Sequence, residues 1–169
     1  MGTPSYQATL ARWAPLPLRL IVGYGFMMHG YLKLERGVDV FVAALDGLGI
    51  PLPHLMAWLT VVIELLGGLA VLAGAYVALA SVPMTIVLFV AIAKVHWMFG
   101  FSSIKFLEVT AAGPQFGKPG VECDLIYLAC LAALVLGGSG PWSFDGHRRA
   151  GAGAGAAPRL SRAAAAGKP

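Results

Sequence analysis

The chain has 169 residues, of which 58% are hydrophobic and only 12% are charged, and its mean hydropathy is +0.76. Because soluble domains average about 25% charged residues, this composition excludes an ordinary soluble domain and predicts an integral membrane protein. The formal net charge of +4 does not indicate nucleic acid as a partner, since the basic residues do not form a surface with interleaved aromatic residues.

Four apolar segments predict transmembrane helices in one domain that covers residues 1–147. The expected spans are 14–33, 54–75, 77–100 and 122–141. The first span contains Arg19 near its start, which we expect to snorkel to the nearer headgroups. The fourth has the shortest apolar core, residues 125–138, and it reaches the ~20 residues of a membrane crossing only when it begins at Glu122.

Two further segments complete the expected fold. Between the first two spans, Val38, Phe41, Val42 and Leu45 recur at helical spacing, which predicts a short amphipathic helix in the membrane surface. Residues 148–169 are basic and rich in alanine and glycine, so we expect a disordered tail. The expected fold class is an all-α membrane protein, a four-transmembrane-helix bundle with an interfacial helix between helices 1 and 2.

The orientation follows from the number of helices and from the positive charges. Four crossings place both termini on the same side of the membrane. More Lys and Arg residues lie on that side than in the opposite loops, which predicts cytoplasmic termini and a cytoplasmic tail.

Ionisable side chains inside the predicted spans need an explanation, because each costs about 2.5–3.5 kcal/mol to insert. His29 and His96 lie near the outer ends of the first and third helices, whereas Glu64 lies near the bilayer midplane in the second. Each Cα–Cβ bond tilts toward the N-terminus of its helix, so the two histidines lean inward and Glu64 leans outward. We therefore expect these three side chains to meet in the outer half of the bundle.

Helical spacing selects the neighbours of this cluster. Lys33 follows His29 by one turn on the same face. Lys94 and His96 are two residues apart, about 200° around the helix, so only one of them can face inward. We select His96 and expect Lys94 to snorkel. Glycines on the stripe of the second helix that carries Glu64 allow another helix to approach closely.

The chemistry of this cluster suits proton transfer. A carboxylate beside a lysine is held ionised, and histidine titrates near physiological pH. We predict Glu64 as proton acceptor, His29 and His96 as hydrogen-bond donors or proton relays, and Lys33 as a substrate-binding residue. Glu122 or Asp124 can close the cluster from the fourth helix, and we assign Glu122 to substrate binding.

Quinone or quinol fits this set of donors and acceptors, as does a small polar or anionic substrate. No metal-ligand spacing is visible, no cofactor is required by the sequence, and haem held by two histidines is not expected. A different interpretation is a structural clamp in which the same polar contacts only fix the register of the helices.

Short motifs in a fixed order resemble the DoxX family. The first span contains H-G-x-x-K (His29, Gly30, Lys33), the second contains E-x-x-G-G, and the third has His96 before a Gly-Phe pair. A last helix that begins with Glu122 and ends in "GGSGPWSFD" completes the resemblance, which covers about residues 18–145.

This resemblance implies a small four-helix protein of the bacterial or archaeal cytoplasmic (inner) membrane. It also implies a subunit of a quinone-linked redox assembly, of the thiosulfate:quinone oxidoreductase type or of an oxidative-stress complex. If the chain is catalytic, it is an oxidoreductase subunit acting on or with quinone. The expected partners are the lipid bilayer and other protein subunits or further copies of the chain. Two alternatives stay open: a non-enzymatic membrane scaffold or assembly factor, and a small-solute or proton carrier.

Overall fold

The computed structural model describes residues 6–148, and helices make up most of this part of the chain. Most of the expected tail, residues 149–169, lies outside the described residues. Two of the elements, η1 and η2, are π-helical turns, and η3 is a short 3-10 turn. In chain order the elements are α1 (Tyr6–Trp13), α2 (Pro15–Glu35), α3 (Val38–Gly47), α4 (Pro53–Val62), η1 (Ile63–Gly67), α5 (Gly68–Ala73), α6 (Val77–Ala91), η2 (Ile92–His96), η3 (Trp97–Phe99), β1 (Phe106–Thr110), β2 (Gly113–Phe116) and α7 (Glu122–Gly137).

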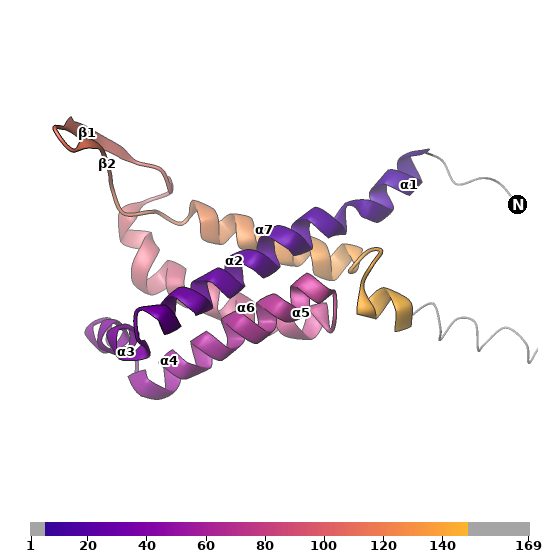
Figure 1. Cartoon of the computed structure of the whole chain (residues 1–169), viewed down its shortest axis with the longest axis horizontal. Helices are drawn as coiled ribbons and strands as arrows, with labels where there is room; N and C mark the ends of the chain where they lie inside the picture. Colours follow the sequence, from indigo (N-terminus) through magenta and orange to yellow (C-terminus); the bar gives the residue numbers. More distant parts are fainter. Residues whose placement is uncertain (1–5, 149–169) are drawn as a thin grey trace, which may run out of the picture.

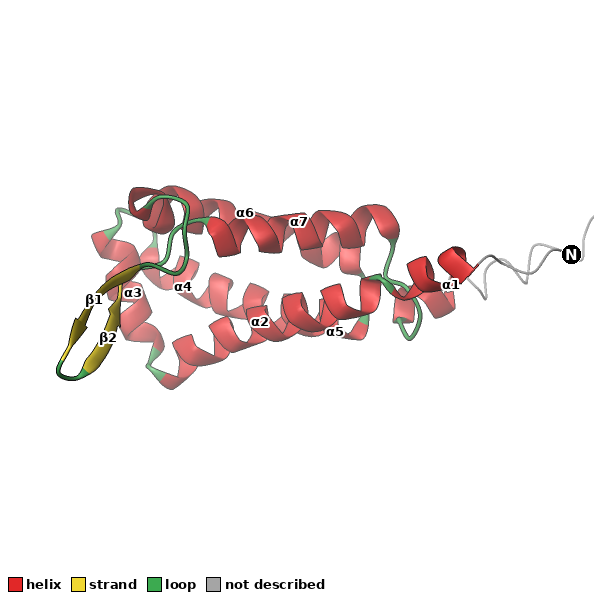
Figure 2. Ribbon diagram, turned by 90° about the horizontal axis from the view of Figure 1, so that it is seen from above, coloured by secondary structure: helices red, strands yellow, loops and turns green. Residues whose placement is uncertain are grey.

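The long helices lie side by side along a common direction (Figures 1 and 2). Elements α4, η1 and α5 form one continuous helix, and α6, η2 and η3 form another. Figure 1 places α1 and the segment after α7 at one end of the bundle, and α3 and the β1–β2 hairpin at the other. The two ends of the described chain therefore lie at the same end of the bundle.

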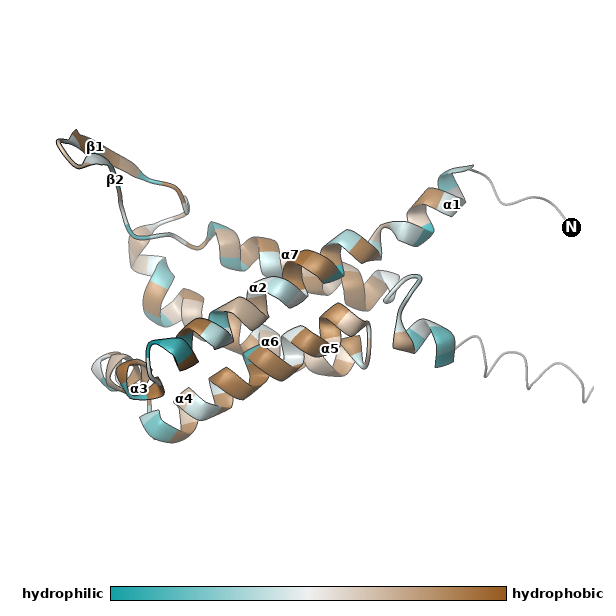
Figure 3. Ribbon diagram, in the orientation of Figure 1, coloured by the Kyte–Doolittle hydropathy of each residue, from teal (hydrophilic) through white to brown (hydrophobic). Residues whose placement is uncertain are grey.

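The core between these helices is apolar and is drawn from α2, α5, α6 and α7. Its fully buried side chains include Val22, Val71, Met84 and Leu134. Such a core excludes water between helices that also expose many large apolar side chains on their outer faces. In Figure 3 the same helices are apolar along most of their length.

Helices α2 and α5 approach each other closely through two glycines. A Cβ atom on Gly68 would lie 2.7 Å from the carbonyl oxygen of Gly23, and a Cβ atom on Gly23 would lie 2.8 Å from the carbonyl oxygen of Gly68. Neither position can carry a side chain unless the helices move apart. The expectation that glycines near Glu64 allow close helix approach is confirmed.

Within residues 6–148, two helices are long and apolar enough to cross a membrane, Pro53–Ala73 and Val77–Phe99. They agree with the second and third predicted spans to within two residues. The first predicted span corresponds to α2, which carries Arg19, Lys33 and Glu35.

The helix of the fourth predicted span is shorter than expected. Helix α7 has 16 residues and ends at Gly137, four residues before the expected limit of the span at 141. Gly138 has a φ of 82° and takes the chain out of the helix. At 1.5 Å per residue, α7 is about 24 Å long.

Helix α3 forms where an amphipathic helix is predicted, and its apolar side packs on α4. Val42 and Leu45 are buried together with Ala57 of α4, and Val38 and Phe41 pack against them. This side of α3 is therefore covered by protein rather than left for lipid. The two helices are joined by a turn in which Leu52 has a φ of 51°, directly before Pro53.

The small antiparallel sheet formed by β1 and β2 differs from the all-α fold that the sequence predicts. The hairpin follows the third predicted span and precedes α7. It stands apart from the helices in both views (Figures 1 and 2). Its backbone continues into a stem where Gly117 donates to the carbonyl of Lys105 and Gly120 donates to the carbonyl of Ser102.

The expectation that Arg19 snorkels to headgroups is wrong. Its residue surface is only 2% exposed, and its guanidinium donates hydrogen bonds to backbone carbonyls at the end of α5 and after α7. Carbonyls at a helix C-terminus have no partner within their own helix, so they are good acceptors for a cation. The accepting residues are Val71, Leu72, Ser139, Pro141 and Trp142.

Candidate functional site

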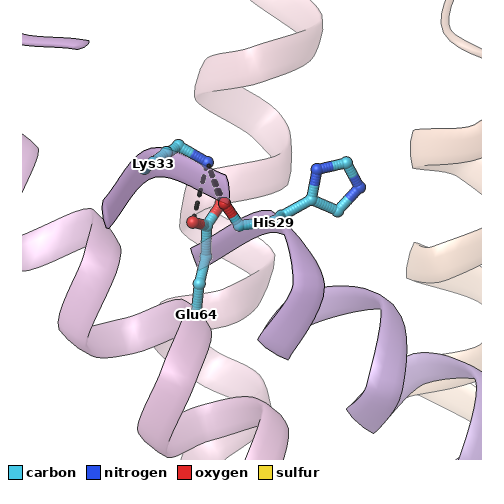
Figure 4. A network of polar contacts seen from close by, with 3 residues as sticks. All are labelled: His29, Lys33 and Glu64. Carbon is cyan, nitrogen blue, oxygen red and sulfur yellow. Dashed lines mark hydrogen bonds and ion pairs between the residues drawn. The ribbon is translucent and has the colours of Figure 1, made fainter. Parts of the chain in front are cut away.

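Lys33 and Glu64 form a buried ion pair between α2 and η1. The Lys33 amine lies 2.8 Å from Glu64 Oε1 and 2.7 Å from Oε2. The side chain of Glu64 is 7% exposed and that of Lys33 is 20% exposed. Figure 4 shows the two side chains pointing toward each other. The sequence placed both residues in one cluster, and the structure brings them into direct contact.

The π-helical turn η1 carries Glu64, and α3 covers its partner. A π turn accommodates one extra residue and often occurs at a functional site. The Lys33 amine also lies 4.9 Å from the centre of the Phe41 ring of α3, where a cation and an aromatic face attract each other. The ion pair is therefore enclosed by residues from three elements.

His96 and Asp124 form a second polar contact, between η2 and α7. His96 Nδ1 lies 2.5 Å from Asp124 Oδ2, and the Asp124 side chain is 8% exposed. His96 is half-buried, whereas Lys94 is exposed. His96 therefore faces the bundle and Lys94 faces outward, as the helical spacing predicts. Like Glu64, His96 belongs to a π-helical turn.

His29 does not contact Glu64, although the sequence analysis expects the two side chains to meet. Its imidazole points away from the Glu64 carboxylate (Figure 4). The ring lies within electrostatic range of Asp124 and His96. The expected single cluster is therefore divided into the Lys33–Glu64 pair and the His96–Asp124 pair, and His29 lies within electrostatic range of members of both.

The two acidic residues at the start of α7 have different partners. Glu122 accepts a hydrogen bond from the backbone N–H of Ser103 at 2.9 Å, and it thereby holds the loop that leads to the hairpin. Asp124 contacts His96 instead. Of the two residues that could close the cluster, the structure brings Asp124 into it and leaves Glu122 at its edge.

An open groove of ≈ 330 Å³ lies beside the first pair, between the end of α2 and α3. Its walls include His29, Lys33, Arg36 and Phe41. This volume is at the lower end of the range for small-molecule sites. The groove combines cationic and imidazole donors with apolar walls.

The chemistry open to these groups is hydrogen bonding and proton transfer. When Nδ1 of a neutral His96 donates to Asp124, Nε2 is the acceptor nitrogen of the ring. The pair can therefore accept a proton and donate it again. Among residues 6–148, no group of three or more His, Cys, Asp and Glu residues is arranged to hold a metal ion.

The fold and the composition define a helical membrane protein, with polar residues paired inside the bundle. The model of the DoxX family matches residues 14–97, and the chain belongs to the DoxX family. The match includes His29, Lys33, Glu64 and His96 and ends before the hairpin and α7. Neither the curated proteins nor the solved structures searched contain a match to this chain.

Proposed function

We propose that the chain crosses the cytoplasmic membrane of a bacterium or archaeon four times, as a subunit of a quinone-linked redox assembly. In this arrangement α2 and α7 are the first and fourth spans, and both termini are cytoplasmic. Backbone without helical hydrogen bonds is tolerated at membrane depth only where other groups satisfy it. Arg19 supplies such donors to Ser139, Pro141 and Trp142, which supports a fourth span that continues past the end of α7.

The observation that carries the redox proposal is the pairing of His96 with buried Asp124 in electrostatic range of His29. Asp124 contacts Nδ1 of His96 and orients the ring. In our proposal the other ring nitrogen, Nε2, forms a hydrogen bond with the substrate. His29 adds a second imidazole, which also lines the groove beside Lys33. These residues lie near the ends of α2 and η2 and at the start of α7, and in our proposal one quinone headgroup contacts them together.

The chemistry of quinones matches these groups. Reduction of a quinone to a quinol takes up two electrons and two protons at its two oxygen atoms. In our proposal a partner subunit supplies the electrons, and His96 and His29 exchange the protons with the oxygens. Glu64 holds Lys33 in place at the groove, where the amine donates to a substrate oxygen. Buried imidazoles and carboxylates supply these proton-transfer roles in many enzymes.

The test is a binding titration with the purified full-length chain in lipid nanodiscs. A short-chain ubiquinone analogue is added, and tryptophan fluorescence reports binding. We expect saturable binding that His96→Ala weakens by about tenfold or more, equivalent to about 1.4 kcal/mol. The matched control is Lys94→Ala, which removes an exposed side chain from the same π turn and should leave the affinity unchanged. Equal affinities in all three proteins, or no saturable binding, would overturn the proposal.

A second candidate is a scaffold or assembly factor, and one observation favours it. Among residues 6–148, every buried side-chain nitrogen or oxygen has a hydrogen-bond partner, as expected if the polar pairs only lock the helices together. This candidate predicts that Glu64→Gln lowers thermal stability and the yield of a native complex while quinone affinity stays at the wild-type value. The redox proposal predicts that His96→Ala reduces quinone affinity even when the protein remains folded.

A further inference from the structure

The β1–β2 hairpin has one apolar and one polar face, because its register contains a bulge. Phe106 pairs with Phe116, but the next pair is Glu108 with Gln115, so Leu107 is an extra residue on β1. Residues paired across antiparallel strands point to the same face, and neighbours along a strand point to opposite faces. An extra residue shifts this alternation by one position.

The shift sorts the paired side chains by polarity, while the unpaired Leu107 is itself 63% exposed. Phe106 and Phe116 share a face, which then also receives the pair Val109 and Pro114. The opposite face receives Glu108, Gln115 and Thr110. Contacts agree with this assignment. The centres of the Phe106 and Phe116 rings lie 6.3 Å apart, and the Gln115 amide nitrogen lies 3.5 Å from the Thr110 hydroxyl. Strict alternation without the bulge would have placed Phe106, Glu108 and Thr110 on one side.

We propose that this hairpin lies on the surface of the phospholipid bilayer, with the apolar face of Phe106, Val109, Pro114 and Phe116 in the boundary between headgroups and acyl chains. The proposal rests on the membrane-spanning arrangement proposed above, and it does not depend on quinone binding. A two-stranded hairpin is marginally stable alone in water, so a surface that covers the apolar face also stabilises the strands.

The position of the hairpin relative to the third helix supports a lipid surface. The amines of Lys105 and Lys118, at the two sides of the stem, lie 5.9 Å and 5.3 Å from the centre of the Phe99 ring. Phe99 is the last residue of the helix Val77–Phe99, so both amines lie where a spanning helix meets the headgroups. Lysines at this level pair with lipid phosphates while their alkyl chains cover apolar surface.

Exposed apolar residues also lie where that helix ends. Trp97 and Met98 in its last turn, and Phe101 and Ile104 after it, are all exposed. Tryptophan is enriched at the boundary between membrane and water. The hairpin therefore begins next to exposed apolar residues at the end of this helix, and in our proposal both enter the same layer of the bilayer.

Taken alone, the apolar face of the hairpin is smaller than one side of a stable protein interface. Phe106 and Phe116 are each 59% exposed, and Val109 is 73% exposed. With 150–250 Å² for a complete aromatic side chain, the face offers roughly 400 Å². A stable protein interface buries about 800 Å² on each partner. Insertion into a bilayer has no such minimum, because its affinity grows with each apolar group buried.

The stem fixes the orientation of the hairpin relative to the helices. Backbone N–H groups of Gly120, Val121 and Glu122 donate to carbonyls of Ser102, Gly100 and Phe101. The Glu122 carboxylate adds a hydrogen bond to Ser103 N–H.

The test measures the depth of a fluorescent label on each face of the hairpin. Single cysteines are introduced as Val109→Cys on the apolar face and Glu108→Cys on the polar face, in a full chain carrying Cys123→Ser and Cys130→Ala. A Leu136→Cys variant places the label on an exposed apolar position of α7. Each protein is labelled with NBD and inserted into nanodiscs of phosphatidylcholine and phosphatidylglycerol.

Two quenchers then distinguish the surroundings of each label. We expect spin-labelled lipids to quench NBD at Val109 and Leu136, and dithionite to reduce NBD at Val109 several-fold more slowly than at Glu108. Equal reduction at Val109 and Glu108, with lipid quenching only at Leu136, would overturn the hairpin proposal alone. Protection at Val109 without lipid quenching would indicate a protein contact and would also overturn it. Absence of lipid quenching at Leu136 would overturn both the hairpin proposal and the membrane-spanning arrangement.

Discussion

Removing Lys33 alone should destabilise the bundle more than removing both members of the Lys33–Glu64 pair. The variants are Lys33→Met, Glu64→Gln and the double variant. Lys33→Met leaves a carboxylate with a side chain that is 7% exposed and has lost its cation. Glu64→Gln leaves an amine beside a neutral amide. The double variant has neither charge and keeps similar side-chain volumes.

The geometry sets the size of the expected effect. At 2.7 Å and an effective dielectric constant of about 20, the attraction between the two charges is about 6 kcal/mol. Desolvation of both groups offsets much of this attraction, whereas loss of one partner from a buried pair costs about 3–5 kcal/mol. We expect about 3 kcal/mol for Lys33→Met and a coupling energy of about 2 kcal/mol between the two sites.

The measurement is equilibrium unfolding of the purified variants in mixed detergent micelles, with the free energy of unfolding compared around the double-mutant cycle. Lys94→Met is the control, because Lys94 is exposed and its loss should change stability by no more than about 0.5 kcal/mol. Additive effects, with a coupling energy below about 0.5 kcal/mol, would refute the inference that this ion pair holds α2 against η1.

Three further substitutions test other contacts. Gly68→Ala should lower the free energy of unfolding by about 1–3 kcal/mol, because its Cβ would lie 2.7 Å from a backbone oxygen. Chemical denaturation measures this loss. Gly47→Ala is the control and should leave the free energy of unfolding unchanged, because no atom lies within 4 Å of its Cβ. Arg19→Met should lower the free energy of unfolding by about 3 kcal/mol or more, because buried carbonyls lose their hydrogen-bond donors. A melting temperature close to that of the wild type would contradict this expectation. Asp124→Asn should weaken quinone binding by about tenfold while circular dichroism stays unchanged; unchanged affinity would remove Asp124 from the site.

Much of the helical pattern was predictable because it is local. The second and third long helices agree with the apolar runs bounded by Pro53, Gly74 and Gly100. The hairpin was not predictable from hydropathy, because its two faces arise from a bulge in the pairing of β1 with β2. Helix α7 ends early at a glycine of positive φ, which a count of apolar residues does not detect.

The site could be predicted where helical spacing alone determines which side chain faces the bundle. The choice of His96 over Lys94 depends on the helix repeat, and the structure agrees with it. The partners of Glu64 and His96 depend on how separate helices pack, so the sequence could not choose Lys33 over His29 or Asp124 over Glu122. The burial of Arg19 depends on carbonyls about 120 residues away, which no local signal indicates.

Photo-cross-linking with an azido-quinone shows directly whether paired polar residues from separate helices form a site for a quinone headgroup. The full chain in nanodiscs is labelled with and without excess unlabelled quinone, and the labelled peptides are identified by mass spectrometry. We expect labelling of the segments around His29 and His96, and we expect excess unlabelled quinone to reduce it. Labelling that does not compete, or that occurs only on segments at the Arg19 end of the bundle, would contradict this expectation.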